Sequence, residues 1–138
     1  MDPFQHFLDA QAPVYETALA ELRSGRKRTH WIWFIFPQLA GLGSSPRARR
    51  FGLHSLEEAR AYLAHPILGT RLIECSRVLL RHDGLTAEQI LGLVDAMKLR
   101  SSMTLFAAVS EGECIFQVVL ESHFDGTLDS KTLQLLGV

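Results

Sequence analysis

The chain has 138 residues, which suits one domain with a substantial hydrophobic core. Apolar residues make up 47% and charged residues 21%, a balance typical of a soluble globular protein and not of a disordered one. The formal net charge of -1 excludes a strong overall attraction to nucleic acid or to an anionic membrane. We therefore expect a single domain over residues 1–138, and we do not expect nucleic acid as a partner.

Positive charge is concentrated in one part of the chain. Seven of the 14 Arg and Lys residues fall between Arg23 and Arg50, a segment that contains no Asp or Glu. The other segments hold all 15 acids and the remaining seven bases. Charge runs of this kind are usually solvated faces, and a patch that attracts phosphate beside a binding pocket is the alternative.

The sequence shows neither a targeting signal nor a metal-ligand pattern. The opening MDPFQHFLDA is acidic and amphipathic, unlike a secretory signal peptide, and the longest apolar run, Trp31–Phe36, is too short to span a membrane. Cys75 and Cys114 have no CxxC spacing, and the six histidines form no HxxxH or HExxH pattern. We expect a cytoplasmic protein with free thiols, no membrane contact, no metal site and no cofactor.

Helix signals follow one another along the first part of the chain. The spacing of apolar residues predicts a helix near Phe4–Leu8, and a second helix between Pro13 and Gly25. The six apolar residues Trp31–Phe36 could form a buried strand or a short helix. The helix is favoured because no second strong strand is available for pairing.

Capping signals divide the rest of the chain into further helices. Ser55 with Glu58, and Thr86 with Gln89, have the spacing of a capping box, and Pro66 separates two helices. The remaining helices are expected over about 66–81, 94–109 and 113–123, with a last short one after Asp129. The sequence therefore predicts an all-α single domain of about seven to eight short helices.

A line of polar residues runs along the long helix expected in DAMKLRSSMTLF. At 100° per residue, Asp95, Lys98 and Ser102 stack at i, i+3 and i+7 in the middle of an apolar arc. This placement puts Val94 on the inward arc and Ala96 on the opposite side. A Lys on an apolar face is costly unless it is paired, and Asp95 is the partner that we expect.

This polar line is either a structural network or the floor of a site. A partly desolvated Lys beside a carboxylate and a hydroxyl can bind a phosphate or carboxylate group, or move protons. Asp95, Lys98 and Ser102 are therefore candidate catalytic residues. In the structural alternative, Asp95 caps the helix and Lys98 extends to the surface. Neither Ser101 nor Ser102 has the GxSxG or SxxK setting of a nucleophile.

The aromatic stretch offers a second set of polar groups. If it is helical, His30, Trp33, Phe34 and Gln38 share one face. Core packing accounts for the Ile and Phe residues, whereas aromatic walls with a few polar groups also suit a nucleobase or a similar planar ligand. The candidate ligand-binding residues are Arg28, His30, Trp31, Trp33, Gln38, Arg100, Ser101 and Thr104.

Four long stretches resemble a bacterial family known as domain of unknown function 1810. They are DAQAPVYETALAELRSGRKRTHWIWFIFPQLAGLG, HSLEEARAYLAHPILGTRLIEC, DAMKLRSSMTLFAAV and DSKTLQLLG, and the resemblance extends over nearly the whole chain. The resemblance implies a small all-α cytoplasmic domain with no assigned activity. Some members carry the label calpastatin, which does not fit this composition, since animal calpastatins are disordered inhibitors. Members often have two acidic residues before MKLRSSMTLF, where this chain has Val94 and Asp95 followed by Ala96.

The order of features, without a shared motif, is also similar to that of the NADAR family of N-glycosidases, which act on ADP-ribose-type substrates. That resemblance suggests a hydrolase as the enzyme hypothesis. If the domain cleaves an N-glycosidic bond, an acid such as Asp95 would stabilise positive charge developing on the sugar. Two function classes stay open. The first is a domain that binds or processes a small nucleotide-like or phosphorylated ligand. The second is a non-catalytic helical module for protein interaction or dimerisation, and a monomer and a homodimer are both compatible with the sequence.

Overall fold

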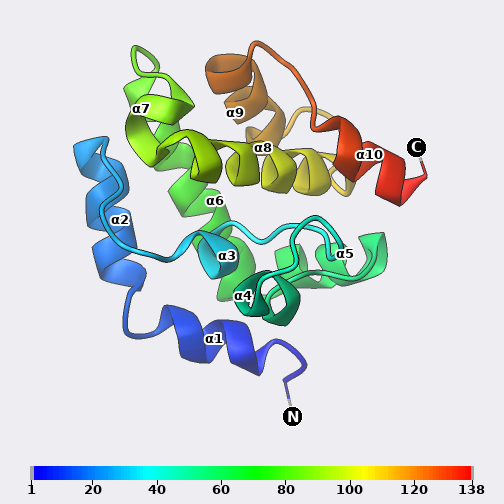
Figure 1. The fold of residues 1–138 in the computed structure, drawn as a ribbon. Helices are drawn as coiled ribbons and strands as arrows, with labels where there is room; N and C mark the ends of the chain where they lie inside the picture. Colours follow the sequence, from blue (N-terminus) through cyan, green and yellow to red (C-terminus); the bar gives the residue numbers. More distant parts are fainter. Residues whose placement is uncertain (1, 138) are drawn as a thin grey trace.

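The computed structural model describes residues 2–137 and confirms the all-α single domain. In this part of the chain there are ten α-helices and one 3-10 turn: α1 (Gln5–Gln11), α2 (Tyr15–Ser24), α3 (Ile32–Ile35), α4 (Pro46–Arg50), α5 (Leu56–Ala64), α6 (Leu68–Leu79), η1 (Leu80–His82), α7 (Ala87–Leu91), α8 (Leu93–Ala108), α9 (Ile115–Phe124) and α10 (Ser130–Leu136) (Figure 1). Seven helices have seven or more residues, and the others are short pieces of four or five. None of the helices described here is long and apolar enough to cross a membrane.

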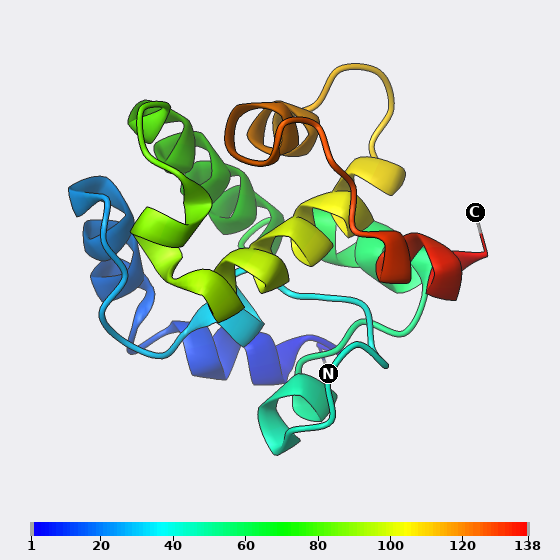
Figure 2. The same cartoon turned by 45° about the horizontal axis from the view of Figure 1, so that its top comes forward.

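The longest helix, α8, passes through the middle of the molecule. It contacts α7, α9 and α10, and also α3 and α5 (Figures 1 and 2). Residues 101–106 of α8 are all buried, because neighbouring helices surround this part of it. The other long helix, α6, packs against α2, α5 and α9. Together these two helices organise the core.

The exposure of α8 differs from the predicted arc in its first turns. Val94, expected inward, is 64% exposed, and Ala96, expected on the outer side, is buried. Leu93 and Met97 are also exposed, so the start of α8 presents apolar side chains to solvent. A single inward-facing arc of residues describes a helix that is covered along one face only. This description is wrong for α8, because neighbouring elements cover one side of the helix near its start and all sides further along.

Side-chain caps are present at Ser55, Thr86 and Asp129, but only one of the two predicted capping boxes is complete. The hydroxyl of Ser55 accepts the backbone N–H of Glu58 at 3.0 Å, without a return bond from the Glu58 side chain. Thr86 and Gln89 form the complete capping box, with distances of 3.1 and 2.8 Å. The Asp129 side chain accepts a backbone N–H at the start of α10 at 2.9 Å. These local bonds explain why the helix starts could be located from sequence.

The chain between Gln38 and Leu53 leaves the core and returns to the same place. The N–H of Leu53 donates to the carbonyl of Gln38 at 2.9 Å, and the N–H of Ala40 donates to the carbonyl of Leu53 at 2.7 Å. A parallel bridge between Leu39 and Leu53 accompanies these bonds. The excursion carries α4, and its first part runs beside α8 and the start of α10 (Figure 2). It forms one wall of the cleft described next.

Candidate ligand-binding site

An open cleft of about 720 Å³ lies between α3 with the loop before α4, α8, and the start of α10. Its apolar lining comes from Trp33, Leu42, Val94 and Met97. Its charged lining consists of three cations and one acid, namely Lys98, Arg100, Lys131 and Asp129. Along α8, Val94 and Met97 come first, and Lys98 and Arg100 follow within the next turn. Lys98 also lies beside the ring of Trp33, so apolar and positively charged groups adjoin one another in the cleft.

Trp33 is half-buried and has two cations beside its ring. The Nζ of Lys98 and the Cζ of Arg47 each lie 4.9 Å from the ring centroid. Contacts of this kind contribute about 0.5–1 kcal/mol at exposed sites. A planar ligand that stacks on Trp33 can replace one of these cations at little cost. An anionic group on the same ligand would then give the displaced cation a new partner.

Asp95 joins two lysines beside the cleft. Its Oδ1 accepts a hydrogen bond from the Nζ of Lys98 at 3.1 Å, and its Oδ2 is 2.8 Å from the Nζ of Lys27. Lys27 lies 5.0 Å from the ring centroid of Trp31. The pairing of Asp95 with Lys98 expected from the i, i+3 spacing is thus present in the structure. Lys27 is an additional member, which helix spacing could not indicate because it comes from the loop after α2.

Arg100 has donors that the protein leaves unused. Its Nε is buried and has no hydrogen-bond partner among the described residues. Its Nη2 is 3.8 Å from the Oδ1 of Asp129, which is beyond hydrogen-bond distance. A guanidinium edge binds the two oxygens of a carboxylate or phosphate in a planar fork. Arg100 lines the cleft, and its guanidinium group is of a kind that suits an oxyanion, although the Nε itself is buried.

Five of the predicted site residues line the cleft: Trp33, Gln38, Lys98, Arg100 and Ser101. Two other predicted residues of α8 lie in the core instead. Ser102 is fully buried, and its Oγ has no partner in the described part of the chain. Thr104 links two helices, since its hydroxyl donates to the carbonyl of Arg100 at 2.8 Å and accepts the N–H of Asp129 at 2.9 Å.

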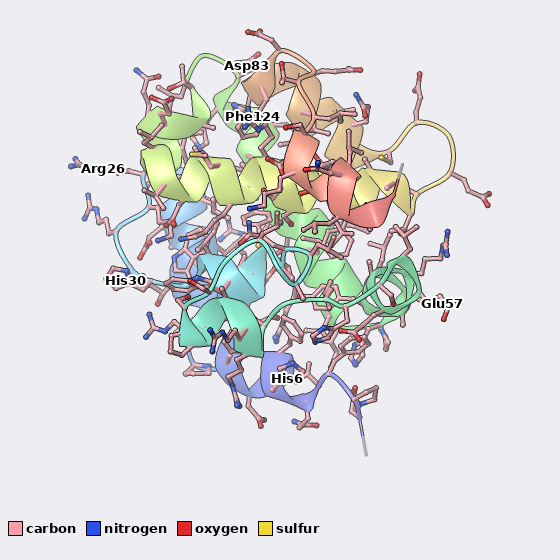
Figure 3. All side chains as sticks on the ribbon, turned by 45° about the vertical axis from the view of Figure 1, so that its right-hand side comes forward. His6, Arg26, His30, Glu57, Asp83 and Phe124 are labelled. Atoms are coloured by element: carbon pink, nitrogen blue, oxygen red, sulfur yellow. The ribbon has the colours of Figure 1, made fainter. Side chains whose placement is uncertain are left out.

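The predicted residues before α3 do not reach the cleft. Arg28 and His30 are exposed, and His30 lies at the edge of the molecule on the loop before α3 (Figure 3). Trp31 is fully buried. Because α3 spans only Ile32–Ile35, His30 and Gln38 do not share a helical face as predicted. The helix is short because the chain before it is bound to a side chain of α2 and Pro37 follows it.

That side chain is Glu21, which holds the loop carrying Lys27. It accepts hydrogen bonds from the N–H of Arg28 (2.8 Å), the N–H and hydroxyl of Thr29 (3.0 and 2.7 Å) and the indole N–H of Trp31 (3.0 Å). Burial alone would raise the pKa of Glu21, but the four hydrogen bonds outweigh it and lower this pKa to about 2. Glu21 is therefore ionised and anchors the loop.

The sequence did not single out Glu21, Asp129 or Lys131 as site residues, and it indicated Lys27 only as one member of the basic segment Arg23–Arg50. Asp129 was expected only as a cap, and the capping signal at least placed it at the start of a helix. Glu21 and Lys131 have no local signal, because their importance comes from contacts with distant segments. Between residues 2 and 137 no cluster of three or more His, Cys, Asp or Glu side chains could hold a metal ion.

Comparison with known proteins agrees with the resemblance seen in the sequence. The crystal structure of the conserved hypothetical protein Rv1873 from Mycobacterium tuberculosis is similar to this chain with 51% sequence identity, a TM-score of 0.95 and 99% of each chain covered. No curated protein matches the chain. The family model described as "Protein of unknown function (DUF1810)" matches residues 2–136. The chain therefore belongs to the DUF1810 family.

Proposed function

We propose that this domain binds a small nucleotide-like or phosphorylated ligand in the cleft between α3, α8 and α10. The observation that carries the proposal is the convergence of three groups on one solvent-reachable space. They are the half-buried ring of Trp33, the ammonium of Lys98 and the guanidinium of Arg100. Ligand sites typically combine an apolar wall with a few polar groups that orient the ligand.

The distribution of charge supports an anionic ligand. Three cations and one acid line the cleft, although the whole chain has a net charge of -1. Trp33 and Val94 suit a planar group, and Lys98, Arg100 and Lys131 suit a phosphate or carboxylate. A nucleotide has both kinds of group.

Hydrolysis of such a ligand would use the acid that faces it. Asp129 lines the cleft, whereas Asp95 stands beside the cleft and is paired with Lys27 and Lys98. An N-glycosidase requires a carboxylate near the sugar that develops positive charge. We therefore assign this role to Asp129 for any such reaction, and release of free base from nucleoside monophosphates is the assay.

A thermal-shift screen of nucleoside monophosphates and phosphorylated sugars tests ligand binding. A ligand that binds only the folded state raises the melting temperature by mass action. We expect at least one phosphorylated compound to stabilise the wild-type protein. Lys98→Met should lose most of this stabilisation, because it removes the charge but keeps a flexible apolar stem beside Trp33.

Arg77→Met is the matched control, since Arg77 is exposed on α6 and does not line the cleft. Its ligand-induced shift should equal that of the wild type. The proposal is contradicted if no phosphorylated compound stabilises the protein, or if wild type and the Lys98 variant are stabilised equally.

The exposed apolar side chains at the start of α8 favour a second function, that of an interaction or dimerisation module. Leu93, Val94 and Met97 are 61%, 64% and 54% exposed and lie within the first two turns. Sedimentation velocity across a wide range of concentrations distinguishes the two functions. A dimer through this strip is expected to dissociate on Val94→Asp and to persist on Val118→Asp, which changes an exposed valine of α9.

A further inference from the structure

We infer that Lys27 is a positioning residue that sets the charge of the cleft. By binding Asp95, it leaves the ammonium of Lys98 available to the anionic group of the ligand. This inference rests on the proposed function of the cleft. It assigns a role in ligand selectivity to a residue that does not line the cleft.

The geometry shows how Asp95 is shared. Lys27 approaches Asp95 to 2.8 Å and Lys98 to 3.1 Å, and each lysine uses a different carboxylate oxygen. The side chain of Lys27 is 6% exposed, against 23% for Lys98. Water and salt screen the more buried pair less, so Lys27 is the stronger partner of Asp95.

Lys27 is held by more contacts than Lys98. The N–H of Lys27 donates to the carbonyl of Ile90 at 2.7 Å, and its Nζ also donates to the carbonyl of Thr29. The loop on which it lies is anchored by the four hydrogen bonds of Glu21. Lys98 has one hydrogen bond, to Asp95, and otherwise lies against the ring of Trp33 at the cleft. A ligand can therefore draw Lys98 away while Lys27 stays.

The charges of these three side chains explain how Lys27 affects the binding of anions in the cleft. Lys27, Asp95 and Lys98 together have a net charge of +1, which faces the cleft through Lys98. Without Lys27, the carboxylate of Asp95 would cancel the charge of Lys98 and would repel an anion that binds beside it. The preference of the cleft for anions thus depends on Lys27.

Isothermal titration of Lys27→Met, Asp95→Asn and the double variant tests this inference. The probes are AMP, GMP, CMP and UMP in turn, with the matching nucleosides as uncharged counterparts. Lys27→Met should weaken nucleotide binding about fivefold, because Asp95 then pairs fully with Lys98, and a pair at the protein surface contributes up to about 1 kcal/mol. Nucleoside binding should not change. The double variant should regain wild-type affinity, because the carboxylate that competes for Lys98 is also gone.

The inference is overturned if Lys27→Met binds nucleotides like the wild type, or if the double variant binds as weakly as Lys27→Met. If Lys27→Met does not fold, the nucleotide affinity of the Asp95→Asn variant alone tests the inference. Affinity equal to or above that of the wild type supports the inference, and a loss of affinity overturns it.

A measurement without ligand separates this inference from the proposed function. The coupling free energy between Asp95 and Lys98 is obtained from urea unfolding of the two single variants and their double variant. It should increase in the Lys27→Met background, where Asp95 has only one partner. If the coupling free energy between Asp95 and Lys98 rises but no nucleotide binds, the proposed function fails, while the sharing of Asp95 by the two lysines is supported. If nucleotides bind the wild type and coupling does not rise, the inference fails and the proposed function stands.

Discussion

Glu21→Ala is expected to lower the free energy of unfolding by about 3–5 kcal/mol, because it leaves several buried or half-buried donors without their charged acceptor. The affected donors are the indole N–H of Trp31, the hydroxyl of Thr29 and the N–H groups of Arg28 and Thr29. Urea unfolding followed by circular dichroism measures the loss.

Glu16→Ala is the matched control, since Glu16 lies on the same helix and is exposed. It should cost less than about 1 kcal/mol. Equal losses for the two variants would show that the hydrogen bonds of Glu21 do not hold the loop.

The same carboxylate predicts a dependence on pH. The pKa of Glu21 is lowered from 4.5 to about 2 in the folded protein, so its stabilising contribution is fully present above pH 4.5. The contribution of Glu21 to the free energy of unfolding is lost as the pH falls from 4.5 towards 2. The carboxyl group takes up a proton near pH 4.5 in the unfolded state, but only near pH 2 in the folded state. The stability difference between wild type and Glu21→Gln should therefore shrink over this range. A difference that stays constant between neutral pH and pH 3 would contradict the lowered pKa.

Arg100→Met is expected to weaken nucleotide binding by about 10–100-fold, since hydrogen bonds to a charged group contribute about 1.5–3 kcal/mol. The nucleotide anion would lose the hydrogen bonds donated by the guanidinium group of Arg100. Titration calorimetry with nucleoside monophosphates measures the change. Arg100→Lys should recover only part of the affinity, because a lysine has the charge without the planar fork.

Two controls accompany this prediction. Arg77→Met should bind nucleotides like the wild type, because Arg77 is exposed on α6. Binding of the uncharged nucleosides should change little in Arg100→Met. Full recovery by Arg100→Lys would show that only charge matters, and that the planar guanidinium group of Arg100 has no role.

Helix positions were predictable from sequence where short-range chemistry decides them. Thr86 and Gln89 lie within one turn of each other and satisfy each other's backbone groups, so their spacing alone identifies the start of α7. The same holds for Ser55 and Asp129, whose side chains cap the helices that follow them. The predicted range 94–109 agrees with α8 (Leu93–Ala108) to within one residue at each end.

The environment of each helix face was less predictable, because it depends on neighbours that the local sequence does not reveal. Val94 and Ala96 were assigned to the wrong sides, since α8 is covered unevenly along its length. The pair Asp95–Lys98 was expected from spacing within one helix, but Lys27 comes from a loop that Glu21 holds in place. The candidate site depends mainly on such long-range contacts.

The two tryptophans of the chain are in opposite environments, and this gives the protein an internal optical reference. Trp31 is fully buried and bonded to Glu21, whereas Trp33 is half-buried at the cleft beside Lys98. Fluorescence from Trp33 should respond to quenchers and to occupants of the cleft, while emission from Trp31 should stay constant. The variant Trp33→Phe keeps only Trp31 and should give fluorescence that does not change with ligand. The variant Trp31→Phe keeps only Trp33 and should give fluorescence that does change. Occupancy of the cleft can therefore be followed without an attached dye.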